Sequence, residues 1–232
     1  MAAFDNGRAL GADGFELDVH LSRDGQVMVH HDPTLDRTTD RSGHLEDFTA
    51  EELGRVDAGY RFTRGGDYPF RGRGCGIPTL RAVLAHYPGH RIIIEMKVDR
   101  GEMARAVVDL VRGADAVDRV CLGSFGLAVL RVARALEPAI ATSAAREEVR
   151  WALYRSWCGW PVKRAPYCGY QVPELSGATR VISRRFVDQA HRAGLGVQVW
   201  TVDTEPDARR LLEWGVDGLI TDRPDVIVPV IS

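Results

Sequence analysis

The sequence predicts an α/β fold, a (β/α)₈ TIM barrel that lacks its first β-strand. Short β-branched segments alternate with amphipathic helical segments over most of the chain, which is typical of a parallel sheet with crossover helices. Seven predicted strands follow a single unpartnered helix, so the pattern matches a barrel from its first helix onward. A doubly wound open sheet is the alternative, because alternation alone does not show whether the sheet closes.

Length and composition indicate a single domain, covering residues 1–232. A chain of 232 residues with 45% hydrophobic content can bury one large core, and barrels of this length are routinely single domains. The 30 basic and 32 acidic residues give a formal charge of −2. No excess of positive charge is therefore available for a nucleic-acid backbone, and we expect no nucleic-acid partner.

Cysteine spacing and hydropathy indicate the compartment. The four cysteines form no CxxC pair and have no zinc-like spacing, so we expect reduced, buried thiols. No apolar run approaches the ~18 residues of a membrane span, and the first residues lack the features of a signal peptide. We therefore expect a cytoplasmic protein without stable membrane insertion, unless an export signal precedes Met1.

The first predicted element is a helix that ends at Gly11. Ala3, Gly7 and Leu10 fall on one helical face, which we expect to be its packed side. The predicted strands cover residues 14–21, 91–97, 119–125, 139–144, 167–173, 196–203 and 217–222. The predicted helices between them cover residues 79–87, 101–113, 126–136, 146–157, 183–193 and 205–214.

The segment from about Pro33 to Ile77 does not follow this repeat. It contains turn signals, a short helical stretch (TAEELGRV) and a Gly-rich aromatic stretch (GGDYPFRGRGCGIP). Because it is too long for an ordinary barrel loop, we expect an insertion over residues 33–77 that caps one end of the barrel.

Polar residues close several predicted strands, and in a barrel these C-terminal ends share the face where active sites are built. Glu16 and Asp18 are two residues apart on one strand, so both side chains point the same way. Glu95 closes the neighbouring strand and would complete an oxygen-rich site of the kind that Mg²⁺ or Ca²⁺ prefers. The alternative is that these acids pair with nearby Arg and Lys residues.

One of two adjacent histidines, together with Lys97, suggests catalysis beside this predicted metal site. His30 and His31 are adjacent on an extended stretch, so at most one of them faces the pocket. A histidine near a metal-bound anion is a good proton donor to a leaving group, although a structural hydrogen-bonding role is the common alternative. Lys97 would neutralise charge on a phosphoryl group.

Two strand-end residues, Gln171 and Trp200, are predicted to bind substrate. Trp200 offers a flat apolar wall for an alkyl or glycerol group, or else belongs to the core. Trp151, Tyr154 and Trp157 recur near helical spacing. We expect these three to pack on the barrel, with membrane contact as the less favoured alternative.

These residues lie in segments that resemble the glycerophosphodiester phosphodiesterase family. The resemblance rests on GADGFELDVHLSRDGQVMVHHDPTLDRTTDRSGHLED, followed in order by IPTLRAVL, IIIEMK, VQVWTVDT and GVDGLITDRPD. It implies a phosphatidylinositol-phospholipase-C-like (β/α)₈ barrel that hydrolyses small glycerophosphodiesters to sn-glycerol 3-phosphate and an alcohol, with Ca²⁺ or Mg²⁺.

The resemblance also implies residue roles. Glu16 and Asp18 match the metal-binding Glu-x-Asp pair, and Glu95 matches the acid of the Glu-x-Lys motif. His31, directly before Asp32, matches the histidine that protonates the leaving alcohol. Lys97 and Trp200 match residues that line the substrate pocket.

One part of the family pattern is not found in the sequence. Members begin with a strand that ends in His-Arg-Gly and continues into Pro-Glu-Asn-Thr, where the histidine is the partner general base; neither motif occurs in this chain. Relative to the family pattern, that strand and its loop, about twenty residues at ordinary element lengths, are missing. The sequence leaves open whether they lie upstream of Met1 or the chain begins at Met1. Losing one proton-transfer group typically lowers a rate ~10²–10⁴-fold.

Three functions therefore stay open: a complete diesterase, a non-catalytic relative that binds metal or phosphate, and a sphingomyelinase D or phospholipase D-like lipid phosphodiesterase. The sequence favours the first. It leaves open the alcohol released, the choice between Ca²⁺ and Mg²⁺, the oligomeric state, and whether a cyclic phosphate intermediate forms.

Overall fold

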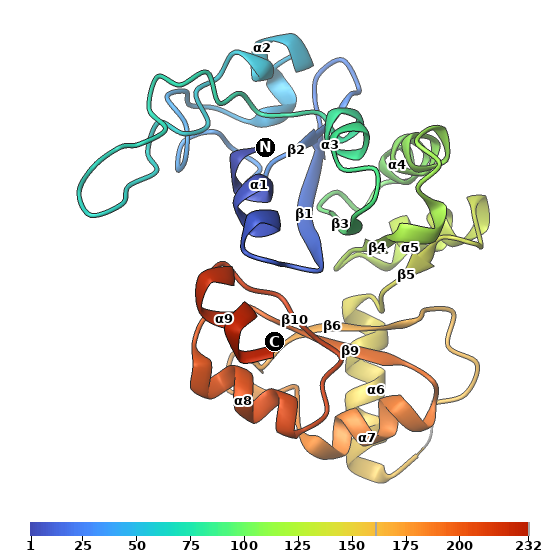
Figure 1. Cartoon of the computed structure of the whole chain (residues 1–232). Helices are drawn as coiled ribbons and strands as arrows, with labels where there is room; N and C mark the ends of the chain where they lie inside the picture. The colour runs from blue at the N-terminus through green and yellow to red at the C-terminus, as the bar shows by residue number, and fades with distance from the viewer. Residues whose placement is uncertain (161, 232) are drawn as a thin grey trace.

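The computed structural model describes residues 1–160 and 162–231 and has the α/β architecture that the sequence predicts (Figure 1). Five strands form one sheet in the order β2-β1-β3-β4-β5, and three form another in the order β10-β9-β6. The strands of the first sheet are β1 (Gly14–Leu21), β2 (Val27–Val29), β3 (Arg91–Met96), β4 (Val120–Gly123) and β5 (Ala141–Thr142). Those of the second are β6 (Gly169–Pro173), β9 (Gly196–Trp200) and β10 (Gly218–Leu219).

The two sheets are parts of one open barrel. A parallel bridge between Ser143 and Gly169 continues the order from β5 to β6. Apart from β2, which runs antiparallel to the end of β1, all pairs in these two sheets are parallel. Within the described residues, β10 pairs only with β9, and residues 14–18 of β1 pair only with β3. The barrel is therefore open between β1 and β10, as expected for a sheet without its first strand.

Helices cover the outer side of the sheet strands (Figure 1). They are α1 (Ala2–Ala9), α3 (Leu80–His86), α4 (Gly101–Gly113), α5 (Leu127–Leu136), α6 (Arg146–Cys158), α7 (Arg184–Arg192), α8 (Glu205–Glu213) and α9 (Pro224–Ile231). Short 3₁₀ turns η1 (Leu45–Asp47) and η2 (Val117–Arg119) and a small hairpin of β7 (Leu175–Ser176) and β8 (Thr179–Arg180) complete the connections.

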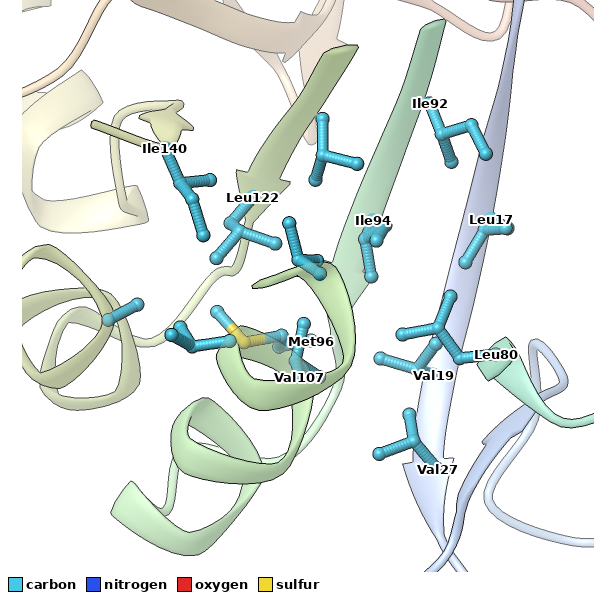
Figure 2. Packing of buried hydrophobic residues seen from close by; sticks show 14 of the residues in the cluster. Leu17, Val19, Val27, Leu80, Ile92, Ile94, Met96, Val107, Leu122 and Ile140 are labelled. Carbon is cyan, nitrogen blue, oxygen red and sulfur yellow. The ribbon is translucent and has the colours of Figure 1, made fainter. Parts of the chain in front are cut away.

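The hydrophobic core lies between the sheet and these helices. Alternate residues of each strand face outward, as Leu17, Ile94 and Leu122 do in the cluster of β1, β3 and β4 with α4 and α5 (Figure 2). A second cluster joins β6 and β9 to α6, α7 and α8. The other residues of each strand face the interior of the barrel, which leaves that interior to the polar side chains of the site.

The insertion after β2 has a small core of its own. Met28, Leu35, Leu45, Leu53 and Ile77 are buried together. The predicted helical stretch forms α2 (Ala50–Gly54), which begins with a capping box between Thr49 and Glu52. Residues 60–74 form an exposed arm that projects from this part of the chain (Figure 1).

Two sequence-based expectations about packing are wrong. On α1 the packed residue is Phe4, whose ring lies 5.1 Å from that of Phe15, whereas Ala3 and Leu10 are exposed. The helix is short, and one large ring there covers more core than the smaller residues of the predicted face. The cysteines are free, but Cys158 and Cys168 are exposed because they lie at the end of α6 and just before β6.

Candidate active site

Three acids and one lysine meet at the carboxyl ends of β1 and β3. The parallel register sets Asp18 directly opposite Glu95, and Glu16 lies two residues before Asp18 on the same side of β1. Lys97 follows β3, and its Nζ forms an ion pair with Asp18 Oδ1 at 2.7 Å. Four of the residues predicted for the site are therefore neighbours.

The two glutamates are held in a setting that disfavours their ionised form. Burial raises the pKa of Glu16 to about 8, and the negative charges of Asp18 and Glu95 add to this effect. Burial also raises the pKa of Glu95 to about 7, although Lys97 and a hydrogen bond from the Phe125 N–H to Glu95 Oε1 (3.1 Å) act in the opposite direction. Three buried or half-buried carboxyl groups therefore lie near the positive charge of one lysine, Lys97. A bound cation would stabilise the ionised form of these carboxyl groups.

The donor chemistry of this group suits a hard divalent cation, because all its potential ligands are carboxylate oxygens. Over residues 1–160 and 162–231, however, no three His, Cys, Asp or Glu side chains are grouped closely enough to hold a metal ion. Asp18 is instead paired with Lys97. Metal binding by Glu16, Asp18 and Glu95 would require their side chains to rotate, and it stays a prediction.

Gly123 on β4 makes room for the interior polar groups. A Cβ added there would lie 2.6 Å from Glu95 Oε2, 3.0 Å from Gln171 Oε1 and 3.4 Å from Ser143 Oγ. Gln171 therefore approaches Glu95 across this glycine. Its Nε2 donates a hydrogen bond to Gln198 Oε1 at 3.0 Å, which fixes the orientation of its amide.

An aromatic wall stands beside Glu95. The ring of Trp200, at the end of β9, packs edge-on against Phe125 with a centroid distance of 6.1 Å. Phe125 also contacts Arg146, whose guanidinium lies 4.7 Å from the centroid of the Phe125 ring. The peptide bond between Trp200 and Thr201 is cis. Trp200 is half-buried, so part of its surface remains available to a ligand.

His31 directly follows a residue that is hydrogen-bonded to the backbone of β1. The His30 N–H donates a hydrogen bond to the Asp18 carbonyl at 3.0 Å. This bond places the backbone just before His31 beside the carboxyl end of β1. Its imidazole is exposed, with Nδ1 at 2.6 Å from Asp32 Oδ1. Arg37 binds both oxygens of Asp32 and helps to lower the pKa of that carboxyl. His30 instead lies against the Thr34 carbonyl and is half-buried.

A cavity of about 610 Å³ shares one residue with this group, Lys97, and is lined by none of Glu16, Asp18, Glu95, His31, Gln171 and Trp200. Lys97, Val98 and Arg100 line one side of it, and the β1–β2 turn and residues 44–47 line the other. Lys97 is thus shared between the acidic group and the cavity. The insertion contributes residues 44–47 to the cavity wall, and its role as a cap over the barrel stays a prediction.

Comparison with known families decides between the alternative folds and family assignments. The model of the glycerophosphoryl diester phosphodiesterase family matches residues 1–226. The chain belongs to this family. A glycerophosphodiester phosphodiesterase from Bacillus altitudinis is 32% identical over 238 residues, covering 99% of this chain and 91% of that protein. One from Caldanaerobacter subterraneus is 29% identical, covering 100% of this chain and 90% of the relative.

Solved structures of the same family share the fold. A glycerophosphodiester phosphodiesterase from Agrobacterium tumefaciens has a TM-score of 0.77 at 26% identity and covers 98% of this chain and 91% of its own. An Oleispira antarctica phosphodiesterase, solved in complex with the product sn-glycerol-3-phosphate, has a TM-score of 0.76 at 26% identity, covering 99% and 89%. The barrel fold and the phosphodiesterase family that the sequence motifs indicated are confirmed.

The structure adds residues that sequence reasoning did not select. Gly123 lies against Glu95, Phe125 contacts both Glu95 and Trp200, and Arg146 lies over the Phe125 ring. Gly123 carried one usable signal, because a glycine inside a strand often marks a close approach of neighbouring groups. Phe125 and Arg146 follow two different strands and gave no signal in the sequence. No helix of the described chain is both long enough and apolar enough to span a membrane.

Proposed function

We propose that this member of the family hydrolyses small glycerophosphodiesters to sn-glycerol 3-phosphate and an alcohol. The observation that carries the proposal is the group of Glu16, Asp18, Glu95 and Lys97 at the carboxyl ends of β1 and β3. Glu16, Asp18 and Glu95 would hold Ca²⁺ or Mg²⁺. When bound, such an ion polarises phosphoryl oxygens and offsets the charge that develops on them.

The side chains of the protein supply the remaining functions. Lys97 brings a fixed positive charge to the position where the phosphoryl group gains negative charge during displacement. His31 donates a proton to the oxygen of the departing alcohol. Because Asp32 holds Nδ1 of His31, the Nε2 side of the ring is the side left for this proton transfer.

The substrate's organic groups would lie against the aromatic wall. Trp200 and Phe125 present ring surface for the glycerol carbons. Gln171, held by Gln198, offers its amide to a glycerol hydroxyl.

Hydrolysis of glycerophosphocholine, followed by release of sn-glycerol 3-phosphate, tests this proposal. Turnover should require added Ca²⁺ or Mg²⁺ after treatment with EDTA. Glu16→Gln and His31→Ala should each lower kcat/KM by about 10²–10⁴-fold. His86→Ala is the matched control, since this exposed histidine lies on α3 away from the site. Activity that survives both Glu16→Gln and His31→Ala would contradict the roles proposed for these two residues.

A second candidate is a relative that binds a divalent cation or a phosphate without turnover. One observation favours it: Asp18 is already paired with Lys97. Calorimetry with Ca²⁺ and with sn-glycerol 3-phosphate would then show binding that Glu16→Gln or Lys97→Met removes, while glycerophosphocholine stays intact. Including lysophosphatidylcholine and sphingomyelin in the same assays tests the lipid phosphodiesterase alternative.

A further inference from the structure

The outer side of α6 carries large aromatic side chains that face solvent. Trp151 is 68% exposed, Tyr154 47%, Trp157 55% and Trp160, just after the helix, 66%. We refer to these four residues as the aromatic face. This arrangement corrects the expectation that Trp151, Tyr154 and Trp157 pack on the barrel.

A different side of α6 packs on the barrel. Ala152, Leu153 and Ser156 are buried, and Val149 lies against the same core. The contact between helix and barrel is therefore complete without the rings. Spacing alone could not distinguish the two sides, because apolar residues three apart occur on both of them.

Three rings of the aromatic face, those of Trp151, Tyr154 and Trp157, form one continuous surface. The centroids of Trp151 and Tyr154 are 6.2 Å apart, and those of Tyr154 and Trp157 are 5.6 Å apart, each pair edge to face. Contiguous exposed apolar surface of this kind marks a site of interaction with a partner or a membrane. Indole and phenol rings, which combine an apolar body with a polar group, are enriched at the boundary between lipid and water.

The charge around the aromatic face is positive, although the whole chain is not. Residues 146–164 include five basic and two acidic side chains, against a formal charge of −2 for the full sequence. One of the acids, Glu148, is already bound by Arg134. Within the described residues, Arg150, Lys163 and Arg164 form no ion pair.

The other exposed aromatic group, on the arm, also lies among basic residues, with Arg61, Arg64, Arg71 and Arg73 against one acid, Asp67. On the arm, Arg71 lies over the rings of Tyr60 (4.4 Å) and Tyr68 (3.4 Å), and Phe62 packs against Phe70. The arm's rings therefore have cationic or aromatic partners within the arm. What differs is the central cation: Arg71 of the arm is held by the arm's own rings, whereas Arg150, next to Trp151 in the sequence, lies over none of the described rings. Lys163 and Arg164 follow Trp160 by three and four residues.

We propose that the aromatic face of α6 docks this protein onto the surface of an anionic phospholipid bilayer. The rings enter the region between headgroups and acyl chains, while Arg150, Lys163 and Arg164 contact negatively charged headgroups. The charge complementarity favours a bilayer with acidic lipids over a neutral one. This inference does not rest on the proposed catalytic function.

Co-sedimentation with large unilamellar vesicles tests the proposal directly. Vesicles of phosphatidylcholine with one third phosphatidylglycerol should bind the protein, and pure phosphatidylcholine vesicles should bind it much less. Trp151→Ala/Trp157→Ala should lower the partition coefficient about tenfold or more, since less ring surface is buried. Arg150→Gln should lower it about fivefold, and added salt should weaken binding further.

Phe62→Ala is the matched control, because this ring on the arm is 50% exposed and lies outside the aromatic face. It should bind vesicles as the parent chain does, and all variants should keep the parent Tm because the altered side chains are exposed. Equal binding of Trp151→Ala/Trp157→Ala and the parent chain would overturn the proposal, as would no preference for acidic vesicles. So would a dimer in light scattering that the double substitution dissociates, since a second copy would then occupy the aromatic face.

Discussion

Glu16 shows how one buried carboxyl makes stability depend on pH. Its pKa is raised in the folded chain from 4.5 to about 8, mainly by burial. A carboxyl with a raised folded pKa contributes stability that is complete below the unfolded pKa and is lost as the pH rises through the folded value. The metal-free protein should therefore become less stable between pH values of 4.5 and about 8.

Thermal unfolding in EDTA at several pH values measures this effect. We expect the Tm of the parent chain to fall across that interval and the Tm of Glu16→Gln to fall less, because the amide does not ionise. Glu102→Gln, on the exposed side of α4, is the control and should follow the parent. A parent Tm that does not fall from the acidic to the alkaline end would contradict the burial effect.

Gly123 is a second residue whose surroundings give a sharp expectation. A methyl group there would lie within 3.0 Å of both Glu95 Oε2 and Gln171 Oε1. Gly123→Ala should lower the free energy of unfolding by about 1–3 kcal/mol, as crowding in packed interiors does. It should also reduce turnover, because Glu95 must shift.

Gly113→Ala provides the comparison for this crowding. Gly113 ends α4, and a methyl group added to it would meet nothing within 4 Å. Alanine favours a helix over glycine by up to about 1 kcal/mol. Urea unfolding should therefore show Gly113→Ala to be neutral or stabilising, and equal destabilisation by both substitutions would exclude the steric explanation.

At the scale of elements, α2 depends on its first residue. Thr49 Oγ1 accepts a hydrogen bond from the Glu52 N–H (3.3 Å), and Glu52 Oε2 accepts one from the Thr49 N–H (2.7 Å). Thr49→Ala should cost about 1 kcal/mol in the free energy of unfolding, whereas Thr49→Ser keeps the hydroxyl and most of the stability. Chemical denaturation of the two variants checks this, and equal stabilities would show that the cap contributes nothing.

The elements that sequence reasoning located well are those whose own pattern specifies them. The alternation of GFELDVHL predicted β1 to the residue, and the amphipathic stretch at 101–113 predicted α4 equally well. Strands β5 and β10 shrink to two residues each, because pairing with neighbours sets their length. Helix α9 was not predicted, and it contains Pro229, which sequence patterns read as a helix breaker.

The site was predictable where topology alone brings residues together. Because carboxyl ends of parallel strands meet, the proximity of Asp18, Glu95 and Lys97 followed from their positions. The pairing of Asp18 with Lys97 did not follow, since it depends on side-chain orientation. The exposure of Trp151 likewise could not be read from spacing, because only the packed neighbours of α6 decide which side is buried.

At the scale of the whole molecule, the barrel has two separate hydrophobic clusters. One belongs to β1–β5 and the helices that follow β2, β3 and β4, and the other to β6, β9 and α6–α8. All five tryptophans lie between residues 151 and 214, within the second half. Tryptophan fluorescence therefore reports mainly on that half, while circular dichroism reports on both.

We expect the two probes to give different unfolding transitions, because the barrel is open between β1 and β10. Ile94→Ala, in the first cluster, should cost about 2–5 kcal/mol and shift the circular dichroism transition more than the fluorescence transition. Val197→Ala, in the second cluster, should shift the fluorescence transition. Coincident transitions for the parent and both variants would show that the halves unfold as one cooperative unit.

The polar interior described above separates what stabilises this barrel from what reacts within it. Leu17, Ile94 and Leu122 point outward into the core, while their neighbours Glu16, Glu95 and Gly123 point inward. The outward residues supply the apolar burial that stabilises the barrel, and the inward residues supply the groups proposed to react. We therefore expect exchange of inward side chains such as Gln171 and Gln198 to alter substrate preference while the outward core keeps the same scaffold.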